Sequence, residues 1–188
     1  MKFTRIPTDT FQKLQLNAGI MARAFDVETG EVTEENLVGA TSGGVSFNAA
    51  PTFRDDGEDI DNCPKNMLEL KRLDMWEITM SGTFLTVDTA SAAELIAACD
   101  VSGNKVVPRN DVVAADFKDL WWVGDYSDEN GEQGGFIAIH MMNALSTGGF
   151  SLQSGDKSKG QFAFTYTAHY SMNAQDTVPF EIYIQAGA

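Results

Sequence analysis

Two acidic stretches carry the oxygen ligands that calcium prefers: DYSDENGEQGG (residues 125–135) and RDDGEDIDN (residues 54–62). A calcium loop of the EF-hand type has oxygen ligands at positions 1, 3 and 5, glycine at position 6 and a bidentate glutamate at position 12. Counted from Asp125, position 6 is Asn130 and position 12 is Phe136. No other frame in either stretch fits better. We therefore expect a solvated turn between two strands at 125–135. Its acidic residues are Asp125, Asp128, Glu129 and Glu132.

Motifs for nucleophilic, phosphate and zinc chemistry are incomplete. Residues 44–48 (GVSFN) and 149–153 (GFSLQ) begin like the Gly-x-Ser-x-Gly turn of hydrolases, but both lack the last glycine and precede no helical pattern. Residues 154–160 (SGDKSKG) lack the spacing of a phosphate-binding loop. A zinc site would have to combine four distant residues without local ligand spacing: Cys63, Cys99, His140 and His169. The sequence therefore predicts no enzyme, no cofactor and no metal site.

Composition limits the class of partner. The chain of 188 residues has 27 acidic residues against 13 Lys and Arg, and its formal net charge of -14 argues against binding nucleic acid through phosphate contacts. Its two cysteines are too few for a disulfide framework, which favours a reducing cytoplasm during folding. The N-terminus lacks the apolar segment of a signal peptide, and the longest apolar run, residues 136–145, is about half of a membrane span. We expect neither secretion nor membrane insertion.

The elements that must position any site are mostly strands, because apolar residues recur with period two. FAFTYTAHY (162–170), PFEIYI (179–184), WEITMSGTFLTV (76–87) and VSFNA (45–49) all alternate, with Gly82 a candidate bulge. The second of these places Phe180, Ile182 and Ile184 on an apolar face. The pattern predicts a single domain over 1–188 with a mainly β fold, an antiparallel sandwich or barrel.

One segment, SAAELIAACD (91–100), is typical of a helix. Ser91 and Glu94 have capping-box spacing, and Leu95 and Cys99 share a face. We expect a short helix over about 91–100 that flanks the sheet.

Residues 118–142 contain the most apolar strand pair. FIAIHMM has apolar residues on both faces, so something must cover both: the helix, a second sheet or another subunit. The adjacent Trp121 and Trp122 point to opposite faces of their strand, one into the core and one outward. The outward ring is expected at a subunit interface, although an exposed Trp also suits stacking on a sugar or base. The candidate contact residues of this strand pair are Trp121, Trp122, Ile137, Ile139 and Met141.

A long connection at 54–75 separates two strands and is too long for a hairpin turn. Long loops in compact domains are usually functional or disordered. Acidic residues fill its first half, whereas basic residues among apolar ones fill its second half, which suits a segment that docks on a neighbour. Its expected contact residues are Asp55, Asp56, Glu58, Asp59, Asp61, Lys65, Met67, Leu68, Leu70, Lys71 and Arg72.

The overall pattern resembles the major tail protein, or tail tube protein, of long-tailed non-contractile bacteriophages and related prophages. Segments that carry the resemblance include LNAGIMARAFD, GATSGG, EDIDNCPKNMLELKRLD, DFKDLWWVGDYSD, GGFIAIHMMNALSTGGFSLQSGDKSKGQFAFTYTAHYS and DTVPFEIYI. They span about residue 14 to residue 184, and none is a catalytic motif.

The resemblance implies a β-sandwich or barrel with one flanking helix, whose copies form rings, typically of six, stacked into a hollow tube for phage DNA. It also implies an N-terminal arm over about 1–20 and a role for the loop at about 54–75 in reaching a neighbour. The inner sheets are expected to join between subunits into the tube wall, to which Trp121, Trp122, Ile137, Ile139 and Met141 would belong. Some relatives carry a C-terminal immunoglobulin-like domain, which we do not expect here. The implied partners are further copies, tape measure, terminator and distal tail proteins, and passing DNA without specific binding. The implied location is the virion, after assembly in the host cytoplasm.

Two further expectations accompany this resemblance. Carboxylates that face the lumen would keep DNA phosphates from binding, and opposite charges on the two halves of the loop would fix the register between copies. The alternative from another class is a β-sandwich module that binds calcium or carbohydrate through an acidic loop and an exposed Trp.

Overall fold

The computed structural model describes residues 5–127 and 133–186. The chain is 49% strand and 11% helical, which confirms the predicted mainly β, antiparallel class with one α-helix. The strands are β1 (Ile20–Ala22), β2 (Thr41–Asp55), β3 (Lys71–Phe84), β4 (Cys99–Ser102), β5 (Lys105–Pro108), β6 (Lys118–Ser127), β7 (Gln133–Ser146), β8 (Ser151–Gln153), β9 (Gln161–Ala168) and β10 (Phe180–Gln185). The helices are α1 (Thr89–Ile96) and the 3-10 turns η1 (Thr10–Gln12), η2 (Glu34–Asn36), η3 (Leu68–Leu70) and η4 (Ala114–Asp116).

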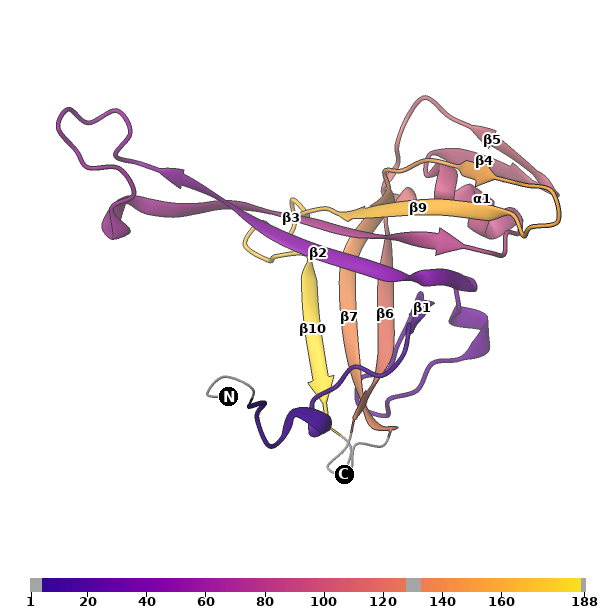
Figure 1. The fold of residues 1–188 in the computed structure, drawn as a ribbon. Helices are drawn as coiled ribbons and strands as arrows, with labels where there is room; N and C mark the ends of the chain where they lie inside the picture. The colour runs from indigo at the N-terminus through magenta and orange to yellow at the C-terminus, as the bar shows by residue number, and fades with distance from the viewer. Residues whose placement is uncertain (1–4, 128–132, 187–188) are drawn as a thin grey trace.

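Strand β7 belongs to both layers of the structure. Its first part, from Phe136 to Met141, pairs with β10, whereas its last part, from Ala144 to Ser146, pairs with β9 on the same edge. The lower layer is therefore β1, β6, β7 and β10, and the upper layer is β9, β3 and β2, which run across it in Figure 1. Strands that leave one sheet for another are a known way to build the corner of a sandwich.

The corner forms at Asn143. This residue has a φ of 49°, and the register of β7 against β6 shifts between the Lys118/Ala144 and Leu120/Met141 pairs, which is the signature of a bulge. The Asn143 backbone N–H donates to the Asp119 carboxylate at 3.1 Å, and its amide donates to the His169 carbonyl at 3.2 Å. Because asparagine tolerates the left-handed region and both polar groups are bonded, the bend is stable.

The main core lies between the two layers. Phe162, Phe164, Tyr166 and Ala168 of β9 are all buried on one face, as the alternation predicts. They pack with residues from α1 and the two layers: Met21, Ile78, Met80, Phe84, Leu95, Leu120, Ile139, Met141 and Ala144.

A second, smaller core covers the other face of the lower layer. Phe25 and the segment after it lie over Ala22, Trp121 and Ala138. Both apolar faces of β7 are therefore covered within the same chain. The upper layer covers one face, and residues 25–32 cover the other.

Helix α1 begins earlier and ends earlier than the predicted 91–100. Its N-cap is Asp88, whose carboxylate accepts from the Ser91 N–H at 2.7 Å, while the Ser91 hydroxyl accepts from the Asp88 N–H at 2.8 Å. The capping box is thus formed by Asp88 and Ser91, and the predicted capping box of Ser91 and Glu94 is wrong. The helix ends at Ala97, which has a φ of 69°, so the following residues form β4 instead.

Gly82 is not itself bulged. The extra residues of the bulge lie on the partner strand, where the register shifts between Thr41 and Val45 and both Gly43 and Gly44 have positive φ. Gly82 is required for another reason: a Cβ there would lie 2.7 Å from Cζ of Phe164, whose ring crosses the strand at this point. Glycine allows this close approach of ring and backbone.

Candidate assembly surface

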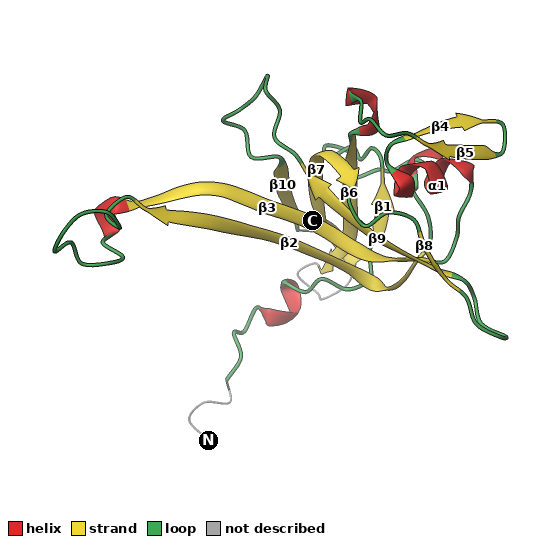
Figure 2. Cartoon of the chain, turned by 90° about the horizontal axis from the view of Figure 1, so that it is seen from above, coloured by secondary structure: helices red, strands yellow, loops and turns green. Residues whose placement is uncertain are grey.

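The predicted long loop at 54–75 is mostly a connection between two strands, as expected, but its ends are strand. β2 and β3 continue to Asp55 and Lys71, so only residues 56–70 are connection. We name residues 50–77 the arm. β9 pairs with β3 only from Thr79 onward, so within the described residues each strand of the arm has only the other as its neighbour. Figures 1 and 2 show the arm extending from one side of the body into solvent.

The tip of the arm is organised by Asp55. Its carboxylate accepts from the Asn66 N–H at 2.8 Å and the Gly57 N–H at 3.0 Å. These backbone hydrogen bonds, that from Asn66 first, hold the pKa of Asp55 below its ordinary value. Gly57 is the buried residue of the tip, because Leu70 lies over it; a Cβ on Gly57 would be 2.6 Å from the Leu70 side chain. Leu70 therefore holds the tip together.

The arm exposes apolar side chains along its length and at its tip. Leu68 is 84% exposed, and Phe53 and Leu73 are about half exposed as a cross-strand pair. The other large apolar residues exposed on the arm are Ile60, Met67 and Met75. A patch of this kind on a projecting element is typical of a protein contact surface.

The charges of the arm pair across its two strands. Arg54 lies 3.2 Å from Asp56 and 3.5 Å from Asp74, and Arg72 lies 3.6 Å from Asp56. The Arg54–Asp74 and Arg72–Asp56 pairs join the two halves of the arm, so part of the charge that we expected to fix a register between copies is used within the arm. Among the described residues, Glu58, Asp59 and Asp61 form no ion pair, whereas Lys65 and Lys71 act on Asp55 through their charge.

The root of the arm is fixed to the body by aromatic residues. Trp76 packs against Phe180 of β10 with ring centroids 5.7 Å apart, and its backbone N–H donates to the Tyr170 hydroxyl at 3.2 Å. The arm is therefore rigidly directed where it leaves the body.

Strand β10 provides a second exposed surface. Within the described residues it pairs only with β7, so its other edge is open. Ile182 is 50% and Ile184 61% exposed, so the predicted apolar face of this strand contacts the core only at Phe180, which is partly buried. An open edge with exposed apolar residues is a template for pairing with another chain.

The two adjacent tryptophans differ in exposure. Trp121 is buried and stacks on His140 at a centroid distance of 4.0 Å. Trp122 lies between Gly19 and Gly124 and donates from Nε1 to the Ala18 carbonyl at 3.1 Å. Ala18 and Gly19 lie against the Trp122 ring, so this ring is only partly exposed, and the expected interface role of an outward Trp stays a prediction. The two flanking glycines are the sequence signal for this packing.

The other expected wall residues divide between core and surface. Ile139 and Met141 are buried in the main core, which accounts for their apolar character without a second subunit. Ile137 is partly exposed near Ile184, its partner across β7 and β10. Ile137 therefore belongs with the open edge of the lower layer.

β6 and β7, which flank the predicted acidic turn, are neighbouring antiparallel strands, but Asp128, Glu129 and Glu132 lie outside the described residues. Asp125 is described, and its carboxylate accepts from the Asn17 amide, while its carbonyl accepts from the Leu16 N–H at 2.9 Å. With Ser127 and Leu14, these bonds attach residues 14–17 of the expected N-terminal arm to β6.

The described residues contain no group of three or more His, Cys, Asp or Glu side chains suited to a metal ion. No helix that they form has the length and apolar composition to cross a membrane.

The sequence matches no known protein-family model and none of the curated proteins.

Proposed function

We propose that this protein is a structural subunit that polymerises with copies of itself into stacked rings, as the tail tube of a long-tailed bacteriophage or a related particle. The observation that carries the proposal is the arm. A two-stranded hairpin is marginally stable by itself, and this one presents large apolar side chains to solvent along its length. A second copy is the occupant that satisfies these side chains.

Geometry supports contacts between unlike surfaces. The arm leaves one side of the body, whereas the open edge of β10 lies in the lower layer. A surface that meets a different surface on the next copy generates rings when the rotation closes and filaments when it does not. In the proposed tube, β10 extends the lower layer into the next subunit of a ring, and the arm reaches an adjacent subunit or ring.

The charge of the chain suits a conduit for DNA. A formal charge of -14 disfavours adhesion of phosphates, so DNA passes without specific binding. The further proposed partners are tape measure, terminator and distal tail proteins, and the proposed location is the virion.

Leu68 offers the cleanest test of the arm. It is the most exposed large apolar residue of the arm and supports no described contact of the tip, unlike Leu70. Full burial of a leucine contributes about 1.5–3 kcal/mol, so Leu68→Asp should weaken each arm contact by roughly 10-fold to 100-fold. We expect a folded monomer that no longer forms tubes, as seen by negative-stain electron microscopy and sedimentation velocity of concentrated protein.

The matched control is Leu152→Asp, which makes the same chemical change at an exposed position on β8, away from the arm. Tubes should form with this variant. Wild-type protein that stays monomeric at high concentration would overturn the proposed function, whereas tubes formed equally by Leu68→Asp would remove the arm tip from the interface.

A further inference from the structure

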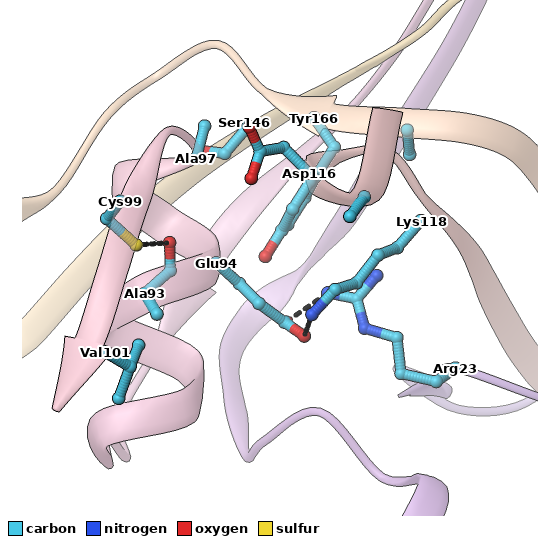
Figure 3. A pocket seen from close by; sticks show the side chains of 12 residues that line it. Arg23, Ala93, Glu94, Ala97, Cys99, Val101, Asp116, Lys118, Ser146 and Tyr166 are labelled. Carbon is cyan, nitrogen blue, oxygen red and sulfur yellow. Dashed lines mark hydrogen bonds and ion pairs between the residues drawn. The ribbon is translucent and has the colours of Figure 1, made fainter. Parts of the chain in front are cut away.

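A pocket of about 160 Å³ lies between α1, β4, η4 and the strands of the body, on the side opposite the arm. Figure 3 shows side chains from three separate elements directed into it: Arg23 from the segment after β1, Lys118 from β6 and Tyr166 from β9. A water molecule takes about 30 Å³ in the liquid, so the space exceeds that of a single water.

Two buried donors in this pocket have no hydrogen-bond partner among the described residues: the Tyr166 hydroxyl and Arg23 Nε. Tyr166 is only 2% exposed, so its hydroxyl cannot reach bulk water. A buried polar group without a partner costs about 1–3 kcal/mol. The Arg23 guanidinium lies near the Tyr166 ring, 5.8 Å from its centroid, but it can only donate, so the O–H still needs an acceptor.

The carboxylates around the pocket are already occupied. Glu94 accepts from Arg23 Nη2 and from Lys118 Nζ, the latter at 3.2 Å. Asp116 accepts from Arg109 Nη2 at 2.7 and 2.9 Å and from the Val113 N–H at 2.9 Å. Neither carboxylate is hydrogen-bonded to the Tyr166 hydroxyl.

Two cations share one carboxylate at the inner part of the pocket. Arg23 and Lys118 both pair with Glu94, whereas Arg109 at the rim pairs with Asp100, Asp111 and Asp116. Burial raises the pKa of Tyr166 to about 12, which keeps its hydroxyl protonated and able to donate. Burial also raises the pKa of the Cys99 thiol, whose S–H donates to the Ala93 carbonyl, so this thiol adds no negative charge.

We propose that this pocket binds a small oxyanion, a phosphate or carboxylate group, between the Tyr166 hydroxyl, Arg23 Nε and Lys118 Nζ. The anion supplies the acceptors that the two buried donors lack, and it lies beside two cations, Arg23 and Lys118, that share a single carboxylate. It also joins α1 to both layers of the body, because its ligands come from separate elements. The pocket shares no residue with the arm, so this site and the proposed tube are independent.

Isothermal titration calorimetry of the dilute protein tests the proposal, with inorganic phosphate and acetate as probes and chloride as the ionic-strength control. We expect saturable binding of one phosphate or acetate and none of chloride. A hydrogen bond to a charged group contributes about 1.5–3 kcal/mol, so Tyr166→Phe should weaken binding by roughly 10-fold to 100-fold. Arg23→Lys, which keeps the charge but loses Nε–H, should weaken it similarly.

Stability without added anion separates a binding site from a structural hydroxyl. Tyr166→Phe keeps the ring and removes a donor that has no described partner, so its Tm in chloride should equal or exceed that of the wild type. Lys118→Met should weaken phosphate binding, while the matched charge change Lys105→Met on β5, outside the pocket, should leave it unchanged.

Three results would overturn the proposal: no saturable heat with either oxyanion, phosphate affinity unchanged in both Tyr166→Phe and Arg23→Lys, or a lowered Tm of Tyr166→Phe in chloride. The last two would show that the pocket holds only water.

Discussion

Gly82→Ala tests how the upper layer is packed. A Cβ at this position would lie 2.7 Å from Cζ of Phe164 and 3.1 Å from the carbonyl oxygen of Gly44. Real Cβ atoms essentially never approach another heavy atom within 3.0 Å, so something must move. Phe164 has little room, because it is buried and stacks on Phe84 at a centroid distance of 4.3 Å.

Overpacking of this kind costs about 1–3 kcal/mol, and the smaller entropy of the unfolded alanine chain offsets about 0.4–1 kcal/mol of it. We therefore expect Gly82→Ala to lower the free energy of unfolding by about 1–2 kcal/mol and the Tm by roughly 2–8 °C. Urea unfolding followed by tryptophan fluorescence and circular dichroism measures both the midpoint and the slope.

The matched control is Gly160→Ala, at a glycine with ordinary backbone where the nearest atom to a new Cβ is 3.4 Å away. It should be neutral or slightly stabilising. The double variant Gly82→Ala/Phe164→Leu should be less destabilised than the sum of the single variants, because the smaller side chain removes the clash. If Gly82→Ala is as stable as the wild type, the ring does not cross the strand as described.

Three other predictions concern single polar groups. Asp88→Ala should lower the free energy of unfolding by about 1 kcal/mol in urea titrations at pH 7, because the Ser91 N–H loses its cap; Asp88→Ser should restore most of it. Backbone hydrogen bonds hold the pKa of Asp55 below its ordinary 3.8, so its contribution to the tip is present above that value and is lost as pH falls through the lowered pKa. Protection of the Asn66 amide, which is the intrinsic exchange rate divided by the observed rate at each pH, should fall across that acidic range in the wild type but be low at all pH values in Asp55→Ala; equal pH dependence of the protection in both would contradict the assignment. Asn143→Val should destabilise the corner by about 1–3 kcal/mol in urea unfolding, whereas Asn143→Gly should cost less, and equal losses would show that the positive φ is not the cause.

The alternation of apolar and polar residues was the sequence pattern that predicted the strands most reliably. The prediction for β9 is correct from Phe162 to Ala168, because one face of this strand packs on the core and the other does not, but the strand ends before Tyr170, which is exposed. β10 followed the same pattern but is an edge strand, so period two in its sequence did not imply burial of Ile182 and Ile184. Alternation indicates which residues share a face, and tertiary structure decides what covers that face.

The predicted loop is correct over residues 56–70, but its ends, residues 54–55 and 71–75, are strand and were not recognised because they lack alternation. Both faces of residues 51–55 and 71–75 meet solvent, so no periodic apolar face is required there. The cross-strand partners of Arg54 and Asp56 follow only from the register of the hairpin, which the sequence does not reveal. The contact set was still placed on one projecting element, since charge and apolar residues were concentrated between two clear strands.

The pocket with Tyr166 was not predicted. Its donors come from positions 23, 118 and 166, which are distant in sequence and carry no shared motif. Tyr166 alternates with core phenylalanines and was read as a core residue, which is correct for its ring. Only the three-dimensional placement reveals that its hydroxyl has no partner.

The corner at Asn143 has a mechanical consequence. Because β7 runs unbroken through both layers, tension applied to the arm passes from β3 through β9 into a strand that is covalently continuous with the lower layer. Separation of the two layers would require more than the loss of the hydrophobic contacts between them. The backbone of β7 would also have to straighten at the corner. A chain built in this way resists stretching through peptide bonds as well as through packing.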